Sequence, residues 1–300
     1  MDPTCLQHCL TDAERRHMNE QGYVVVPEAL DRADCARLIA AVDRVDGRER
    51  TPTFGRERLL SFSNILPEDP AFVDLLDWPR VFPKVWGILG WNIYCYHTHL
   101  DFSPVLSAPP ANPVAWHQDS MRVNEEIECT PRPRLSLKIG YYLTDVSGAD
   151  WGNTLLLPGS HVQDELDTPN DGIASPAGAI PLRVQAGAAL ILDRRLWHSR
   201  SPNFGPHTRK VVWIGYAYRW LRPKDEMTVS GLLESADPIR RQLLGRGSAN
   251  SAYDPEDADV PLRTWLADHC PEDGRWSPHH AKAQARPPLY GTRGKNTGRR

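Results

Sequence analysis

A histidine and an aspartate two positions apart are the first residues in this sequence whose types and spacing could do chemistry. His117 and Asp119 lie in the tetrapeptide 116–119, which we predict to be a strand of a small β-barrel. Successive side chains of a strand point to opposite faces, so these two share a face and Gln118 points away. We propose His198 as a third donor. Two neutral imidazoles and one carboxylate bind one face of an octahedral ion and leave three positions open, which favours Fe(II).

The elements that must position these donors are short strands. From residue 91 onward apolar side chains recur with a period of two, and Pro or Gly residues separate the segments. The expected strands are 93–101, 116–119, 135–143, 154–157, 182–184, 188–192 and 211–218. Many short strands with Pro/Gly turns predict a mainly β protein, a double-stranded β-helix (jelly roll, cupin-like).

The residues before position 91 have helical signals. Thr11 and Glu14 form a capping box, and Gly22 can take the left-handed conformation that ends a helix. A short β-branched strand at 23–26 follows, and a second helix begins near Asp31. We expect a loop over 47–58 and helical turns over 70–76 and 79–89.

The chain is predicted to be one domain over residues 1–280. It has a helical N-terminal part (1–90), a jelly-roll core (91–222) and a C-terminal lid or helical extension (223–280), with short helices over 237–244 and 260–268. Residues 281–300 carry six basic side chains and no acidic ones. We interpret them as a mobile tail. Contact of this tail with nucleic acid is a weaker alternative.

Composition limits the other function classes. A chain of 300 residues with a net charge of −3 is ordinary for a globular protein and gives no global reason to expect nucleic acid. No apolar segment approaches the roughly 18 residues of a membrane span, and no signal peptide is evident. Six scattered cysteines, without a disulfide-like framework, favour a reducing cytoplasm. We expect no membrane partner, and a monomer or a homodimer.

Several motifs together resemble the phytanoyl-CoA dioxygenase (PhyH-like) family of Fe(II)/2-oxoglutarate oxygenases. These are His117-Gln118-Asp119, His198, Arg209 eleven residues later, the turn at 152–161 (GNTLLLPGSH), and the segment at 22–26 (GYVVV). A His-x-Asp alone is a weak signal, but the spacing of all these motifs is specific. The resemblance covers roughly residues 10–220.

The resemblance implies a role for each matching residue. Fe(II) would be bound by His117, Asp119 and His198, which are the catalytic centre. The co-substrate 2-oxoglutarate would chelate two open positions, and O2 would use the last. The far carboxylate of 2-oxoglutarate needs a fixed cation, and the planar guanidinium of Arg209 can bind a carboxylate bidentately. The further co-substrate contacts that we expect are His97, Thr154 and Trp151, with Ser199 as a substitute because the family's usual serine position is Arg200 here.

The implied reaction is hydroxylation of an unactivated C–H bond in a small molecule, coupled to decarboxylation of 2-oxoglutarate. By family analogy the substrate belongs to natural-product or specialised metabolism. Asp119 argues against halogenation, because related halogenases lack this carboxylate. Desaturation or ring formation with the same cofactors, a peptide hydroxylase, and a non-oxidative cupin-type metalloprotein remain as alternatives. Arg209 argues against the last, and an enclosed pocket would argue against a peptide.

The substrate is the least determined part. Arginines surround the proposed centre at 122, 132, 134, 194, 195, 200, 219 and 222. If they line the mouth they favour an anionic substrate, with Arg122, Arg200 and Met121 as candidate contacts. Alternatively they form ion pairs with Glu125, Glu126, Glu128 and Asp193. We expect Lys138 at a solvent-facing rim rather than in the barrel interior, and we expect His99 and His161 to be structural. The loop 121–133 and the segment after Pro223 are the candidate lids.

Overall fold

Two antiparallel sheets form the centre of the molecule in a computed structural model, which describes residues 1–119, 121–166, 172–247 and 251–270. The large sheet has the strand order β1-β7-β4-β9-β3-β2, and the small sheet has the order β6-β5-β8. The large sheet comprises β1 (Tyr23–Val26), β7 (Ala189–Asp193), β4 (Ser136–Tyr142), β9 (Arg209–Tyr218), β3 (Ile93–Ser103) and β2 (Leu60–Ser63). The small sheet comprises β6 (Ile180–Pro181), β5 (Thr154–Leu156) and β8 (His198–Arg200). Two edge strands, β1 and β2, therefore precede residue 91.

The large sheet has one face toward the helices and one face toward the small sheet. On β4 the side chains of Leu137, Ile139 and Tyr141 belong to the core cluster that includes the helices. Tyr142, on the other face, belongs to a second cluster with residues of both sheets, including Leu156. Alternation along each strand therefore separates a helix-packed core from the space between the sheets, where the candidate site lies.

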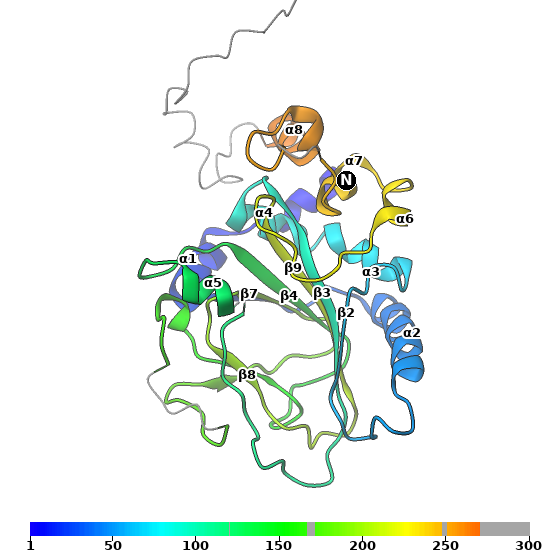
Figure 1. Ribbon diagram of the computed structural model, residues 1–300, viewed down its shortest axis with the longest axis vertical. Coiled ribbons are helices and arrows are strands. Elements are labelled where there is room, and N and C mark those ends of the chain that lie inside the picture. Colours follow the sequence, from blue (N-terminus) through cyan, green and yellow to red (C-terminus); the bar gives the residue numbers. More distant parts are fainter. Residues whose placement is uncertain (120, 167–171, 248–250, 271–300) are drawn as a thin grey trace, which may run out of the picture.

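The helices cover the outer face and the ends of the large sheet (Figure 1). Their bounds are η1 (Pro3–His8), α1 (Asp12–Gln21), α2 (Arg32–Glu49), α3 (Pro70–Asp74), η2 (Leu75–Asp77), α4 (Phe82–Leu89), α5 (Met121–Glu126), η3 (Ser160–Val162), α6 (Ser230–Leu233), α7 (Pro238–Leu243), η4 (Asp257–Asp259) and α8 (Pro261–His269). The capping box at Thr11 and Glu14 is present, and Gly22 ends α1 at φ 82°. In Figure 1, α6, α7 and α8 lie together beyond one end of the sheet.

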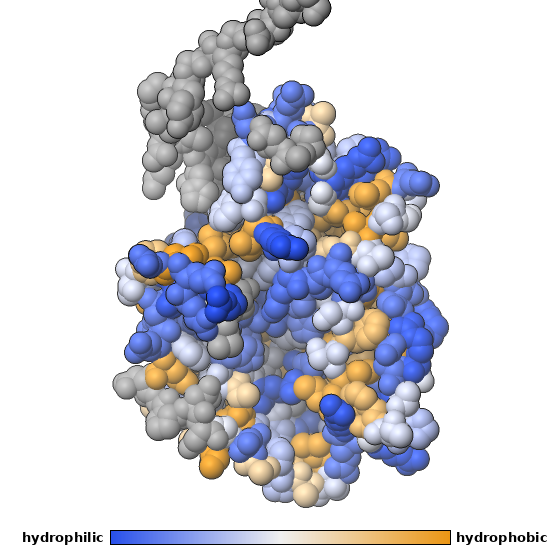
Figure 2. Space-filling model, in the orientation of Figure 1, coloured by the Kyte–Doolittle hydropathy of each residue, from blue (hydrophilic) through white to orange (hydrophobic). Residues whose placement is uncertain are grey.

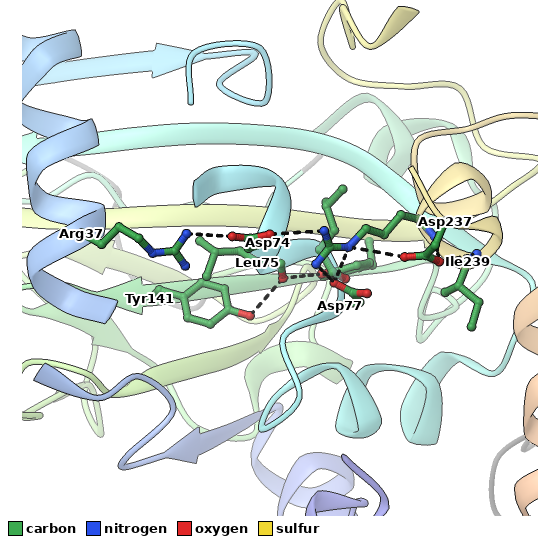
Figure 3. Close-up of polar contacts among 10 residues, drawn as sticks. Arg37, Asp74, Leu75, Asp77, Tyr141, Asp237 and Ile239 are labelled. Carbon is green, nitrogen blue, oxygen red and sulfur yellow. Dashed lines mark hydrogen bonds and ion pairs between the residues drawn. The ribbon is translucent and has the colours of Figure 1, made fainter. Parts of the chain in front are cut away.

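A network of ion pairs joins three helical segments to one another (Figure 3). Asp74 of α3 accepts from Arg37 of α2 at 2.7 Å and from Arg240 of α7 at 3.2 Å. Arg240 also donates to Asp77 at 2.9 Å, while the Tyr141 hydroxyl of β4 donates to the Leu75 carbonyl at 3.4 Å. The helical layer is therefore fixed to the sheet that carries the site residues.

Three sequence predictions about elements are wrong in detail. Residues 116–119 form a single β-bridge at His117 rather than a regular strand. The strand expected at 182–184 lies at Ile180–Pro181 instead, and α2 continues through Gly47 to Glu49 where a loop was expected. The predicted tail at 281–300 lies outside the described residues.

The surface gives no sign of a membrane segment in the described part of the chain. None of its helices is both long and apolar enough to cross a bilayer. On the face shown in Figure 2, hydrophobic residues occur in separate patches among hydrophilic ones. None of the six cysteines forms a disulfide bond.

Candidate active site

A pocket of about 270 Å³ lies between the two sheets and contains most of the predicted site residues. Its lining includes the expected His117, His198, Arg209, Thr154, Ser199 and Arg200, together with Trp213 and with His99, Asp101 and Lys138, which were not expected there. The volume is near the lower end of the range for small-molecule sites, roughly 300–1,000 Å³.

Backbone pairing brings the three proposed metal ligands together from distant parts of the chain. His117 and His198 exchange both of their backbone hydrogen bonds, each at 3.0 Å. The Asp119 amide donates to the Arg194 carbonyl at 2.8 Å. The segment is not a regular strand, but the predicted alternation of side chains holds. The side-chain amide of Gln118 points away from the site and donates to the Gln163 carbonyl at 2.9 Å.

The two imidazoles are oriented by hydrogen bonds of the same kind. Nδ1 of His117 lies 2.9 Å from the Ala115 carbonyl, and Nδ1 of His198 lies 2.9 Å from the Leu196 carbonyl. A carbonyl oxygen only accepts, so both Nδ1 atoms carry the proton and both Nε2 atoms keep a lone pair. Metal-binding histidines are commonly oriented in this way.

The donor atoms form a group that fits a metal ion. One ligand atom from each of His117, Asp119 and His198 lies within 4.8 Å of the others, and His198 Nε2 lies 3.9 Å from Asp119 Oδ2. Asp119 Oδ2 is buried without a hydrogen-bond partner among the described residues. The Lys138 ammonium forms an ion pair with this oxygen at 3.2 Å, but a buried carboxylate oxygen that accepts no hydrogen bond is costly, and a metal ion at this point would satisfy it. Two imidazoles and one carboxylate are also the donors that non-haem Fe(II) prefers.

Electrostatics keep these ligands in their metal-binding protonation states. Burial would raise the pKa of Asp119, but the neighbouring ammonium of Lys138 holds it well below its usual range. Burial, together with the nearby His117, lowers the pKa of His198 to about 3. At neutral pH the carboxylate is therefore ionised and the His198 imidazole is neutral.

Arg209 is a buried cation, 1% exposed, at the start of β9. It donates to Asp101 Oδ2 at 2.8 Å and to Thr154 Oγ1 at 3.2 Å. Its guanidinium carbon lies 5.5 Å from the centre of the Tyr142 ring. Gly152, at φ 70°, allows this position, because a Cβ there would lie 2.9 Å from Cδ of Arg209. The guanidinium is thus held rigidly at the pocket wall.

Asp101 is the pocket residue that sequence reasoning missed. It follows His97 and His99 on the inner face of β3, and it binds both Arg200, at 3.1 Å, and Arg209. Burial would raise the pKa of Asp101, but these two guanidinium groups hold it well below its usual range. Its position was the available signal in the sequence, because residues 97, 99 and 101 alternate along one strand and share a face.

Two other expected co-substrate contacts lie outside the pocket lining. His97 does not line the pocket, and its Nδ1 lies 3.2 Å from the carboxylate of Asp225. His99, two residues later on the same face of β3, does line the pocket and stacks on the Trp213 ring. Trp151 packs edge-on against His207, with ring centres 6.1 Å apart. His99 is therefore a pocket residue rather than only a structural one.

The hydroxyls predicted near the co-substrate have structural partners. Ser199 Oγ accepts from the Ala115 amide at 2.9 Å, which fixes the segment leading to His117. Thr154 Oγ1 lies 2.6 Å from the Tyr142 hydroxyl. His161 is structural as expected, with Nε2 3.0 Å from the Asn19 carbonyl at the end of α1.

The expected position of Lys138 is wrong. It projects into the barrel interior, with Nζ 3.3 Å from Asp119 Oδ1. The reason is the strand period: Leu137 and Ile139 face the helices, so Lys138 faces the small sheet.

Three of the eight arginines near the centre form ion pairs with acids that the alternative interpretation named. Arg122 is exposed and binds Glu125 and Glu126. Arg134 and Arg195 bind Asp193, at 2.6 and 2.7 Å, but this aspartate is fully buried and not at the surface. Arg122 therefore does not line the pocket, and its contact with a substrate stays a prediction. Met121 begins α5, and the prediction for its side chain lies outside the described part of the structure.

Comparisons with known proteins agree with this geometry. A family model described as phytanoyl-CoA dioxygenase (PhyH) matches residues 18–211. A curated protein, dioxygenase af480 of Aspergillus fumigatus, is 23% identical over 248 residues, which are 76% of this chain and 74% of that protein. Among solved structures, HygX of Streptomyces hygroscopicus with nickel and 2-oxoglutarate bound has a TM-score of 0.57 at 15% identity, covering 71% of this chain and 89% of HygX.

A second solved structure supports the same fold. The non-haem α-ketoglutarate-dependent carbocyclase SnoK from nogalamycin biosynthesis has a TM-score of 0.54 at 18% identity, covering 76% of this chain and 92% of SnoK. The predicted double-stranded β-helix with flanking helices is thereby confirmed.

Proposed function

The chain belongs to the phytanoyl-CoA dioxygenase family, whose members use Fe(II) and 2-oxoglutarate, and we propose that it hydroxylates an unactivated C–H bond of a small molecule at the His117, Asp119 and His198 centre. The enzyme is a 2-oxoglutarate-dependent dioxygenase. Bound iron would supply the oxidising chemistry, in which 2-oxoglutarate, O2 and a C–H substrate give succinate, CO2 and an alcohol.

The observation that carries the assignment of ligands is the arrangement of their lone pairs. Both histidines donate Nδ1–H to a backbone carbonyl, so each presents Nε2, and Asp119 presents a buried oxygen that accepts no hydrogen bond from the described residues. Each protein group enters the metal site already oriented and in the required charge state.

Arg209 supports binding of a diacid in the same pocket. Its guanidinium is buried, permanently charged and fixed by Asp101 and Thr154. A carboxylate that meets this group gains charge-assisted hydrogen bonds and loses little side-chain entropy, because the cation is already ordered. We therefore assign Arg209, with Thr154 beside it, to the far carboxylate of 2-oxoglutarate.

The substrate is expected to be small and to carry a negative group. The pocket of about 270 Å³ favours a small molecule over a peptide. Arg200 and Lys138 are the lining cations that are not assigned to the co-substrate. HygX has been crystallised with hygromycin B, and SnoK is a carbocyclase, so we place this enzyme in specialised metabolism by analogy. Its six cysteines form no disulfide bond, which favours action in the cytoplasm.

The test is release of succinate from 2-oxoglutarate. The protein is loaded anaerobically with ferrous iron, exposed to oxygen, and assayed across a panel of carboxylated and phosphorylated metabolites and neutral analogues. We expect one class of acid to stimulate succinate release and to gain a hydroxyl. A product with two hydrogens fewer than the substrate, and no added oxygen, would favour desaturation or the ring formation suggested by SnoK. No succinate under any condition would refute the function.

A further inference from the structure

Lys138 makes an ion pair with Asp119 inside the barrel. Its side chain is 12% exposed, and its Nζ lies 3.3 Å from Oδ1 and 3.2 Å from Oδ2 of Asp119. The contact with Oδ1 is a hydrogen bond, whereas the contact with Oδ2 is an ion pair without hydrogen-bond geometry. The two oxygens of this carboxylate are therefore not equivalent.

The sheet fixes the position of Lys138. It lies in the middle of β4, between β7 and β9, and pairs with Leu192 and Gly215. Its ammonium also lies 4.7 Å from the centre of the Trp213 ring. That ring lies against β4 because position 140 is glycine, where a Cβ would be 2.6 Å from the ring. A cation over an aromatic face is stabilised, so the ammonium has two fixed partners, the ring and the carboxylate.

The other oxygen of Asp119 faces the histidines. Oδ2 lies 3.9 Å from Nε2 of His198, and one oxygen of Asp119 belongs to the group of donor atoms that fits a metal ion. We propose that Lys138 is a positioning residue that retains Oδ1 of Asp119, so that the carboxylate gives the metal one oxygen and not two. This inference rests on the proposed function, because it assumes that the metal binds at these three residues.

The number of oxygens given by Asp119 decides what else the metal can hold. With two imidazoles and one oxygen, a six-coordinate ion keeps three open positions, which are enough for a two-point chelating acid and for O2. With both carboxylate oxygens bound, two positions remain, and the chelating acid would use both. Carboxylates bind cations in either mode, so a fixed hydrogen bond to one oxygen selects between them.

The experiment counts water molecules on the metal without any turnover. The wild-type protein and the variants are loaded with one equivalent of Mn(II), and the waters on the ion are counted by proton relaxation. We expect three waters for the wild type and two for Lys138→Met, whose side chain cannot hold Oδ1. After 2-oxoglutarate is added, the expected counts are one and none.

A matched control separates the hydrogen bond from the charge. Lys224 is exposed, and its positive charge contributes to the low pKa of Asp119, but within the described residues it forms no hydrogen bond or ion pair with this carboxylate. Lys224→Met should therefore keep three waters. Lys138→Gln, whose amide can still donate to Oδ1, should also keep three, and it serves if the Met variant does not fold.

The outcomes distinguish this inference from the proposed function. Stoichiometric Mn(II) binding with three waters in Lys138→Met and Lys138→Gln alike would overturn the role of Lys138 and leave the metal site intact. Two waters in Lys224→Met would also overturn it, because charge alone would then be sufficient. Absence of stoichiometric Mn(II) binding in the wild type would refute the metal site itself.

Discussion

Replacing Arg209 by methionine should abolish most of the affinity for 2-oxoglutarate while leaving the metal ligands in place. The guanidinium is buried at the pocket wall, where it is fixed by Asp101 and Thr154. Methionine has a similar length and is apolar. It therefore removes the charge and the two N–H donors that would bind a carboxylate, without leaving a large cavity.

The magnitude follows from the interactions that are lost. A bidentate guanidinium–carboxylate contact comprises two charge-assisted hydrogen bonds, each worth roughly 1.5–3 kcal/mol. A loss of about 3 kcal/mol, the lower end of the sum, corresponds to roughly 100-fold in Kd. Asp101 increases the effect, because without Arg209 its carboxylate has only Arg200 as a partner and repels an incoming acid. Arg209→Lys keeps the charge but not the fork, so it should lose less.

The assay is a calorimetric titration of 2-oxoglutarate into Ni(II)-loaded protein, since HygX was crystallised with that pair of ligands. Asp101→Asn in the Arg209→Met background controls for repulsion by Asp101. It should restore thermal stability and little of the binding. A Kd for Arg209→Met within threefold of the wild type would refute the assignment of Arg209.

Two further predictions concern Asp193 and Arg200. Burial would raise the pKa of Asp193, but Arg195 and Arg134 lower it to about 2. Its ionised form therefore stabilises the fold above about pH 4, and this contribution is lost as the pH falls toward 2. Asp193→Asn should lower the free energy of unfolding by about 2 kcal/mol at pH 7. In urea unfolding, this difference from the wild type should become smaller below pH 4. A difference independent of pH would contradict the prediction. Arg200→Ser should leave the Kd of 2-oxoglutarate within about threefold but raise the KM of an anionic substrate about tenfold, the worth of one partly buried charged contact. The reverse pattern in steady-state kinetics would assign Arg200 to the co-substrate.

The sequence was sufficient to predict the donors because their chemistry is specific. The residue types and spacing of His117, Asp119 and His198 indicated the metal ligands, whereas Arg209 was predicted from the resemblance to the family. The structure places all four in or beside one pocket. The jelly roll followed from the period of two and the turn residues. Neither inference needed the pairing of strands to be known.

The errors arose where pairing and local irregularity decide the outcome. Lys138 was expected at a rim, although the apolar side chains on either side of it face the helices and direct it inward. His97 was favoured over His99, and the bulge between Cys95 and His97 shifts the pairing of β3 with β9 at this point. Asp101 was missed because its role depends on two arginines that reach it from other strands.

The central claim is that His117, Asp119 and His198 hold the iron to which 2-oxoglutarate binds. An anaerobic titration tests it most directly: Fe(II) is added to protein with 2-oxoglutarate, and the visible charge-transfer band of the chelated co-substrate is followed. We expect the wild-type band to saturate at one equivalent of iron, and we expect no band in His198→Ala at the same concentrations. A band of equal intensity and stoichiometry in a folded His198→Ala protein would contradict the account.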